Sequence, residues 1–299
     1  MTEALLRRLD VATEAALEAG ALLRSYVGGT LAIEEKRPGD LVTAADRASE
    51  DLILKILRRH FPEDVILTEE SGQQGSPEGA YAWMIDPLDG TTNFAHGYPF
   101  AAVSIGLLQG REPVLGVVCD VFRGDLFRAV QGMGATRNRQ PIRVSTTAEL
   151  SRSLLVTGFA YDRRETPDNN YAEFCHFTHL TQGVRRGGSA ALDLAYVATG
   201  QLDGYWERGL SPWDIAAGIV LVREAGGKVT AYDGSPVDVY SGRLLASNGW
   251  LHAALQEELA QVRPLPVSFP MRRDPRPAYQ NRESLPVERV EFETEVVEE

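Results

Sequence analysis

The spacing of apolar residues predicts two amphipathic helices at the start of the chain. Within residues 3–26, leucine and alanine recur at helical spacing, and the run ends at Gly28-Gly29. A second helix is predicted over about residues 43–60, because Pro62 cannot continue it. Between them, residues 31–35 alternate apolar and polar side chains, which indicates a short strand.

Short apolar runs further along predict strands at residues 65–68, 81–85, 101–108, 113–119 and 126–130. The pairs Gln109-Gly110 and Arg123-Gly124 are typical of turns, so this stretch favours an antiparallel meander. Beyond about residue 150 the pattern alternates between strand and helix, at 154–157, 168–180, 189–199, 203–206, 213–225 and 228–231. Such an order predicts the α/β class, with sheets and helices in layers.

Composition limits the class of protein further. With 299 residues, 43% of them hydrophobic, the chain can bury a core as one large domain or as two joined halves. Its two cysteines, Cys119 and Cys175, form no C-x-x-C pair, which argues against a disulfide framework or a structural zinc site. The sequence has no apolar run of about 20 residues and no signal-peptide pattern. We therefore expect a cytoplasmic protein that does not bind membranes.

The charge balance points away from nucleic acids. The 42 acidic residues outnumber the 30 basic ones, for a net charge of −12, whereas non-specific nucleic-acid binding needs a basic surface. An anionic substrate would also be repelled unless cations occupied its site. Residues 263–299 differ from the rest, being rich in proline and ending in glutamates, and we expect a flexible extension. Within it, the alternation at 290–296 could add a strand to another surface.

One acidic segment has a pattern suited to metal and phosphate. Residues 81–94 read YAWMIDPLDGTTNF, in which an apolar strand ends at Asp86, Pro87 turns the chain and Asp89 follows. Carboxylates bind hard cations through oxygen, while the backbone N–H groups of Gly90-Thr91 can hold phosphate oxygens. The alternative for this segment alone is a surface turn, since such residues dominate turns.

Further acids follow other apolar elements. Glu69 and Glu70 end the strand at 65–68, and Asp214 lies in Ser211-Pro212-Trp213-Asp214, before an apolar helix. The last segment also fits a helix capping box, with Ser211 as N-cap and Asp214 three residues into the helix. If these carboxylates converge, they repel one another unless divalent cations lie between them.

Three segments together resemble the inositol monophosphatase family: TEES (68–71), DPLDGTTNF (86–94) and PWDIAAG (212–218). Supporting stretches are DLVTAAD (40–46), RRGGSAALDLAYVATG (185–200) and LVREAGG (221–227). The resemblance covers roughly residues 3–262. It implies a sandwich of alternating helix and sheet layers, with an N-terminal half (1–145) that carries the metal-binding motifs. A C-terminal half (146–262) would complete the site, and the tail (263–299) has no counterpart.

The family's metal ligands carry over onto five positions. The resemblance implies one magnesium ion on Glu69, Asp86 and the backbone carbonyl of Leu88, and a second between Asp86, Asp89 and Asp214. A third ion would lie near Glu69. Two or three Mg²⁺ ions are therefore the expected cofactors.

The resemblance also implies the reaction, hydrolysis of a small phosphate monoester by a metal-activated water. Asp46, Glu69 and Thr91 are the implied catalytic residues, with Thr91 and Asp46 orienting the water. Lys36 matches a lysine near the metal site, although a surface role is an alternative.

Substrate contacts are implied at the backbone amides of Gly90 and Thr91 for the phosphate, and at the Ala190 backbone, Glu207 and Asp214 for the alcohol. Myo-inositol 1-phosphate is the expected substrate. Residues 157–163 resemble bacterial members, which keeps fructose 1,6-bisphosphate, 3′-phosphoadenosine 5′-phosphate, NADP and histidinol phosphate open. A homodimer is expected by resemblance. The alternative from another class is a protein-binding regulator on a phosphatase scaffold.

Overall fold

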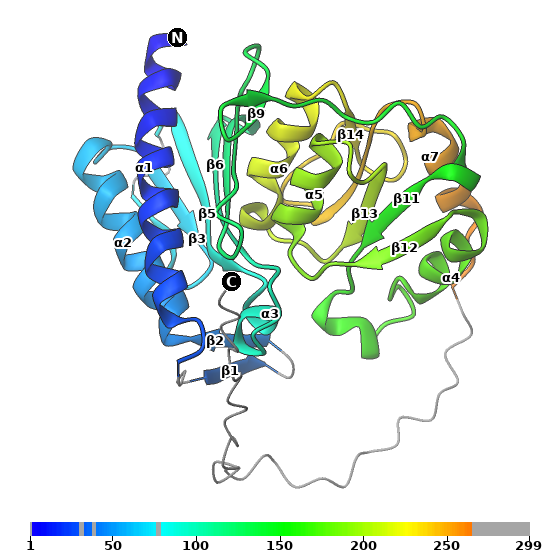
Figure 1. Cartoon of the computed structure of the whole chain (residues 1–299), viewed down its shortest axis with the longest axis horizontal. Coiled ribbons are helices and arrows are strands. Elements are labelled where there is room, and N and C mark those ends of the chain that lie inside the picture. The colour runs from blue at the N-terminus through cyan, green and yellow to red at the C-terminus, as the bar shows by residue number, and fades with distance from the viewer. Residues whose placement is uncertain (1, 30–32, 38–39, 76–78, 265–299) are drawn as a thin grey trace, which may run out of the picture. The chain divides into compact units, whose positions relative to one another are not determined.

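The computed structural model describes residues 2–29, 33–37, 40–75 and 79–264 (Figure 1). Both predicted N-terminal helices are present, as α1 (Thr2–Tyr26) and α2 (Ala44–His60). Between them, β1 (Ile33–Arg37) and β2 (Asp40–Thr43) pair as an antiparallel two-stranded sheet. The sequence pattern indicated the first of these strands and missed the second, whose four residues are too few to display alternation.

The meander predicted from the turn pairs is confirmed within an eight-stranded sheet of order β10-β9-β8-β7-β6-β5-β3-β4. Its strands are β3 (Val65–Thr68), β4 (Gly72–Gln74), β5 (Tyr81–Asp89), β6 (Ala102–Gln109), β7 (Glu112–Asp120), β8 (Leu126–Val130), β9 (Ala135–Arg137) and β10 (Gln140–Pro141). Neighbours from β5 to β10 are antiparallel, whereas β3 and β5 run parallel. The parallel pair places the ends of β3 and β5, with their acidic residues, at one edge of the sheet.

The C-terminal part builds a five-stranded sheet of order β12-β11-β13-β15-β14. Its strands are β11 (Leu154–Thr157), β12 (Gly183–Arg186), β13 (Gly204–Arg208), β14 (Lys228–Thr230) and β15 (Arg243–Ser247). The helices here are α4 (Tyr171–Leu180), α5 (Ala190–Ala198), α6 (Pro212–Glu224) and α7 (His252–Gln261). Three of these elements, β12, β15 and α7, were not predicted.

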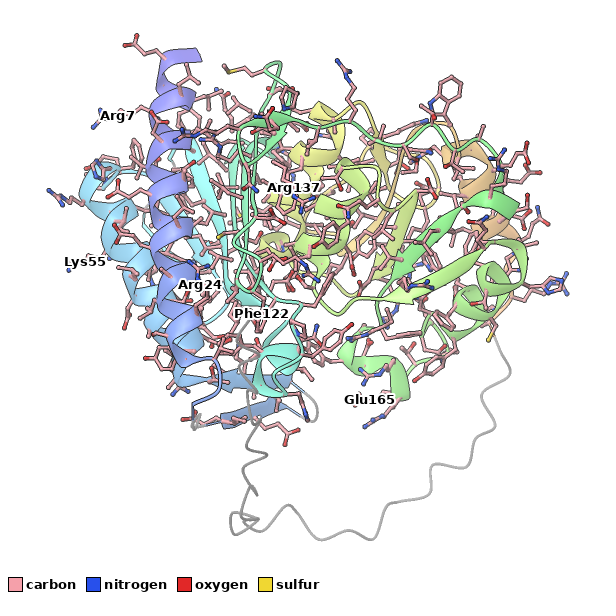
Figure 2. The ribbon with its side chains drawn as sticks, in the orientation of Figure 1. Arg7, Arg24, Lys55, Phe122, Arg137 and Glu165 are labelled. Atoms are coloured by element: carbon pink, nitrogen blue, oxygen red, sulfur yellow. The ribbon has the colours of Figure 1, made fainter. Side chains whose placement is uncertain are left out.

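Helices and sheets alternate in layers, which confirms the predicted fold class. Helices α1 and α2 cover one face of the eight-stranded sheet, α5 and α6 lie between the two sheets, and α4 and α7 pack on the five-stranded sheet (Figure 1). On the outermost layer, Arg7 and Lys55 point away from the sheet (Figure 2). None of the described helices is both long enough and apolar enough to cross a bilayer.

The chain up to residue 265 forms one compact unit. The eight-stranded sheet is complete at Pro141 and the five-stranded sheet begins at Leu154. The division into halves at about residue 145 stays a prediction, although it falls between these two sheets. The predicted tail and its strand at 290–296 lie outside the described residues.

Two glycines determine how closely α6 approaches the larger sheet. Gly106 and Gly116 are paired across β6 and β7, and α6 packs over both. A Cβ atom on Gly116 would lie 2.3 Å from the Ala217 carbonyl oxygen, and one on Gly106 would lie 2.6 Å from the Ala216 Cβ. Since α6 begins near Asp214, this close packing brings the acidic start of the helix to the end of β5.

Candidate active site

A pocket of about 440 Å³ opens where β3, β5, α5 and α6 begin or end. All the predicted site residues except Asp46 line it: Glu69, Asp86, Leu88, Asp89, Gly90, Thr91, Ala190, Glu207 and Asp214. Asp46 lies behind the wall, 1% exposed, and contacts Thr91. The fold thus gathers residues from positions 46 to 214 around one cavity, and their roles remain predictions.

Strand β5 carries two of the acids into the pocket. The sequence indicated that Pro87 turns the chain out of the strand, but β5 continues to Asp89 through an irregularity between Asp86 and Asp89. The expected helix follows as α3 (Thr91–Ala95). Gly90 stands between them with φ 95°, and a Cβ atom there would lie 2.9 Å from the Phe100 carbonyl oxygen, so the turn requires glycine.

The start of α2 supplies the partner of Thr91. Thr43 and Asp46 form a capping box, in which Asp46 Oδ2 accepts the Thr43 backbone N–H at 2.9 Å. The other carboxylate oxygen lies 3.0 Å from the Thr91 hydroxyl, which also lies 3.0 Å from the Leu88 carbonyl oxygen. The buried Asp46 carboxylate therefore caps the start of α2 and also holds the Thr91 side chain of the pocket.

The starts of α5 and α6 bind the other acids. Asp89 Oδ2 accepts hydrogen bonds from the Ser189 hydroxyl and the Ala191 backbone N–H, both at 2.7 Å. Asp214 Oδ2 accepts the backbone N–H of Ser211 at 2.7 Å, as expected of the predicted capping box. Helix N-termini favour negative charge, which offsets part of the cost of burying these carboxylates.

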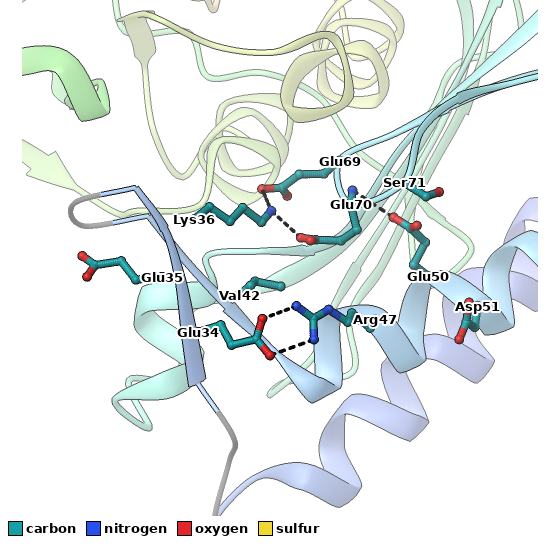
Figure 3. Close-up of a pocket in the computed structure, with 10 residues that line it drawn as sticks. All are labelled: Glu34, Glu35, Lys36, Val42, Arg47, Glu50, Asp51, Glu69, Glu70 and Ser71. Atoms are coloured by element: carbon teal, nitrogen blue, oxygen red, sulfur yellow. Dashed lines mark hydrogen bonds and ion pairs between the residues drawn. The ribbon is translucent and has the colours of Figure 1, made fainter. Parts of the chain in front are cut away.

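Glu69 lies at the boundary between this pocket and a neighbouring one of about 490 Å³ (Figure 3). The Lys36 ammonium group lies 3.0 Å from Glu69 Oε1 and 2.6 Å from Glu70 Oε1. Lys36 thus pairs with both acids that follow β3, a position consistent with the lysine expected near the metal site.

Burial and mutual repulsion raise the pKa values of the site carboxyls. Burial, followed by repulsion from Glu69, Asp89 and Asp214, holds the pKa of Asp86 well above its ordinary value. Burial raises the pKa of Glu69 to about 7 although Lys36 opposes it, and raises that of Asp89 to about 6. The pKa of Asp214 is raised well above its ordinary value by burial and by Asp89. The site therefore disfavours its own negative charge when no cation is bound.

Glu207 also lines the pocket. Its carboxylate accepts the Tyr205 hydroxyl at 2.6 Å, and burial raises its pKa to about 7. Nearby, Asp193 is 1% exposed, and neither of its oxygens has a hydrogen-bond partner in the described part of the chain. The pocket is thus acidic well beyond the positions that metal ligation would need.

Divalent cations suit this pocket by the chemistry of its donors. Six carboxylates line it (Asp40, Glu69, Asp86, Asp89, Glu207 and Asp214) against three basic side chains (Lys36, Arg163 and Arg186). Among the described residues, no three His, Cys, Asp or Glu side chains are arranged to hold an ion as they stand. The hydrogen bonds above engage one oxygen of Asp89 and one of Asp214 with protein donors. These carboxylates repel one another in one cavity, but their hard oxygen atoms are the type of ligand that Mg²⁺ prefers.

Sequence reasoning missed two buried residues next to the site. Ser49 and Glu50 lie on α2 one turn beyond Asp46 and contact the segments that carry the acids. The signal was their spacing of three and four residues from Asp46, which places them on the same helix face.

Two histidines on α4, His176 and His179, lie outside the pocket, and His176 pairs with Glu258 at 2.6 Å.

Comparisons with known proteins agree with this geometry. A model of the inositol monophosphatase family matches residues 5–264. The inositol-1-monophosphatase of Synechocystis sp. is 62% identical over 253 residues, which cover 84% of this chain and 88% of that protein. A solved inositol monophosphatase from Anabaena (Nostoc) sp. aligns with a TM-score of 0.81 at 62% identity, over 87% of this chain and 98% of that one.

A relative with another name is also similar. Nus factor SuhB of Pseudomonas aeruginosa is 43% identical over 268 residues, which cover 87% of this chain and 98% of that protein. The family match spans both sheets and every element that lines the pocket, and it confirms the resemblance carried by the three sequence motifs. The chain therefore belongs to the inositol monophosphatase family.

Proposed function

We propose that this protein is a Mg²⁺-dependent phosphatase that hydrolyses myo-inositol 1-phosphate to inositol and phosphate. One observation carries the proposal: the carboxylate that follows β3 and those of β5 and α6 line a single pocket together with a Gly-Thr turn and Glu207. The similarity to the inositol-1-monophosphatase of Synechocystis sp. supports the choice of substrate. A homodimer and a cytoplasmic location stay predictions.

Glu69, Asp86, Asp89, Asp214 and the Leu88 carbonyl would hold the cations, in the two or three positions that the resemblance implies. When bound, the cations neutralise the phosphate oxygens and make a water molecule more acidic. The excess of acidic over basic side chains in the pocket supports this assignment, because a phosphate ester would otherwise be repelled. The magnesium identity and the number of ions are part of the proposal.

Thr91 and Asp46 orient the attacking water. The Thr91 hydroxyl lies within hydrogen-bond distance of Asp46 Oδ1 and of the Leu88 carbonyl, and it can donate its hydrogen to the carbonyl or to the ionised carboxylate. With its hydrogen directed to either, the Thr91 oxygen is left as an acceptor for a water molecule. Such a fixed acceptor aligns the water in line with the phosphorus, as phosphoryl transfer requires.

The ester is held from two sides. The backbone amides of Gly90 and Thr91 would take phosphate oxygens at the turn that leads into α3. The Ala190 backbone, Glu207 and Asp214 would contact the hydroxyl groups of the alcohol. A carboxylate that already accepts the Tyr205 hydroxyl is fixed in orientation, which favours a ring whose hydroxyls match it.

Phosphate release from a panel of esters tests the substrate. Purified protein is assayed with Mg²⁺ on inositol 1-phosphate, fructose 1,6-bisphosphate, 3′-phosphoadenosine 5′-phosphate, NADP and histidinol phosphate, with and without EDTA. A preference for inositol 1-phosphate that EDTA abolishes is expected. Preference for another ester would change the proposed substrate but keep the proposed reaction. No phosphate release from any ester would reject the proposal.

Asp89→Asn tests the metal assignment against a matched control. Asp203 is buried like Asp89 and also accepts one serine hydroxyl and one backbone N–H, from Ser145 at Oδ1 and from Leu154 at Oδ2. In Asp89→Asn the amide oxygen can accept both bonds, and in Asp203→Asn the amide oxygen can accept from Leu154 while the amide nitrogen donates to the Ser145 hydroxyl, so both variants are expected to fold. Asp89→Asn should lose activity by at least about 100-fold, and Asp203→Asn should retain it.

A second function, as a protein-binding factor, has one observation in its favour, the similarity to a Nus factor. Asp89→Asn separates the two functions, because it removes catalysis and leaves the surface intact. Capture of the same bacterial protein by wild type and by Asp89→Asn, and by no unrelated acidic protein, would support the second function. Absence of any such capture would reject it.

A further inference from the structure

One face of α2 is polar and buried, which is unusual for the middle of a surface helix. Asp46, Ser49 and Glu50 are 1%, 0% and 4% exposed, and their spacing of three and four residues places them on a single stripe. Each contacts a different segment of the pocket wall. Asp46 holds Thr91, and the Ser49 hydroxyl donates to the Pro87 carbonyl at 2.8 Å, between Asp86 and Leu88.

Glu50 contacts the segment that carries Glu69. Its Oε2 accepts the Thr68 hydroxyl and, at 3.0 Å, the backbone N–H of Glu70. These are the residues immediately before and after Glu69, so a single carboxylate oxygen holds the side chain of the first and the backbone of the second. Figure 3 shows Glu50 reaching from α2 toward Glu70, with Glu69 above them.

The arrangement restricts Glu69 in a way that β3 cannot. The last residue of β3 is Thr68, so Glu69 lies just outside the strand, where it keeps one backbone hydrogen bond, from its N–H to Ile85 at 3.2 Å. Its side chain is drawn toward Lys36 in the neighbouring pocket. Strand pairing holds Thr68 and the Glu69 N–H, so without Glu50 the Glu70 N–H would lose its partner and the backbone beyond Glu69 could move toward Lys36.

We propose that Glu50 is a positioning residue that fixes the residues on both sides of Glu69 and thereby sets the protein's affinity for divalent cation. This inference rests on the proposed function, since it takes Glu69 as a cation ligand. Glu50 acts as a hydrogen-bond acceptor, so its shape matters more than its charge. Residues that orient metal ligands in this way typically change metal affinity by about 10–100-fold when removed.

Three variants distinguish positioning from charge. Glu50→Ala removes the acceptor, and Glu50→Gln removes the charge but keeps an oxygen that can accept from Thr68 and Glu70. Asp51→Ala is the matched control, because Asp51 is the next residue of α2, is exposed and lines the same neighbouring pocket. The Kd for Mg²⁺ is measured by calorimetry on substrate-free protein, beside the Tm in EDTA.

The expected result is a Kd at least tenfold higher for Glu50→Ala, and within threefold of wild type for Glu50→Gln and Asp51→Ala. An unchanged Kd in a folded Glu50→Ala protein would overturn the inference and leave Glu50 a stabilising residue only. Equal weakening by Glu50→Gln or by Asp51→Ala would also overturn it, because charge alone would then explain the effect.

Thr68→Val keeps the inference testable if Glu50→Ala does not fold. It removes one of the two donors to Glu50 and leaves the helix untouched, so the Kd for Mg²⁺ should rise by roughly threefold to tenfold. A wild-type Kd in Thr68→Val would contradict the role of Glu50. If wild-type protein itself binds no Mg²⁺, the proposed function fails first and this inference fails with it.

Discussion

The Ser104 hydroxyl of β6 donates a hydrogen bond of 3.2 Å to the backbone carbonyl of Trp213, the residue before Asp214 on α6. Ser104 is also the direct neighbour of Asp86 in the pairing of β5 with β6. The bond therefore ties the sheet side of the pocket to its helix side. The separation of Asp86 and Asp214 depends on how closely α6 lies on the sheet.

Gly116→Ala should force that packing apart. Its Cβ would meet the backbone of Ala217, which cannot move as a flexible side chain does, so we expect a loss of about 1–3 kcal/mol in the free energy of unfolding. Gly183→Ala is the control, since its Cβ meets first the flexible end of Arg185, and it should cost less than roughly 0.5 kcal/mol. Urea unfolding of both variants measures the difference, and equal stability would contradict the packing argument.

Asp86→Asn should stabilise the cation-free protein. Its burial beside Glu69, Asp89 and Asp214 raises the pKa of Asp86, so the folded state bears a penalty above the ordinary carboxyl pKa that an amide avoids. In EDTA we expect the unfolding free energy to rise by on the order of 1 kcal/mol. Mg²⁺ should stabilise wild type and no longer stabilise the variant. Urea unfolding with EDTA and with Mg²⁺ tests this, and Mg²⁺ stabilising both proteins equally would refute it.

Glu207→Gln should separate recognition of the alcohol from the chemistry at phosphorus. Loss of a charged hydrogen-bond acceptor for ring hydroxyls should lower kcat/KM for inositol 1-phosphate by about 10–100-fold. For p-nitrophenyl phosphate, which has no such hydroxyls, the change should stay within roughly threefold. Steady-state kinetics on the two esters provide the comparison. Equal losses on both would assign Glu207 to the reaction itself.

His252 should make stability fall in mild acid. It is 1% exposed, lies 2.9 Å from both the Thr230 and Ser247 hydroxyls, and burial lowers its pKa to about 4. The unfolded chain takes up this proton near pH 6.5, so stability is full above that pH and is lost as pH falls toward 4.

The His252→Gln variant lacks this titrating group. The pH dependence contributed by all other groups cancels when the unfolding free energies of the two proteins are subtracted. The stability advantage of wild type over His252→Gln should shrink by on the order of 100-fold in equilibrium constant from pH 7 to pH 4, because burial is the main cause of the shift from 6.5 to about 4. A difference that stays constant over this range would rule the effect out.

The sequence predicted most elements because their patterns are local. The capping box at Ser211 and Asp214 and the helix after Gly90 follow from residues within one turn of each other. What could not be predicted depends on tertiary contacts. Ser49 and Glu50 are ordinary helix-surface residue types, and only the packing of α2 against β3 and β5 buries them. Likewise, nothing near Asp193 in the sequence indicates a buried carboxyl that has no hydrogen-bond partner among the described residues.

The bonds of Asp89 have a consequence for biosynthesis. Ser189 and Ala191 lie 100 and 102 positions further along the chain, so they are synthesised long after β5. Until they arrive, Asp89 stays hydrated, and a growing chain does not have to confine its acids in a closed cavity. The N-terminal sheet thus leaves the ribosome before Asp214 and the donors to Asp89 exist, and the last layers to dock complete both the fold and the pocket.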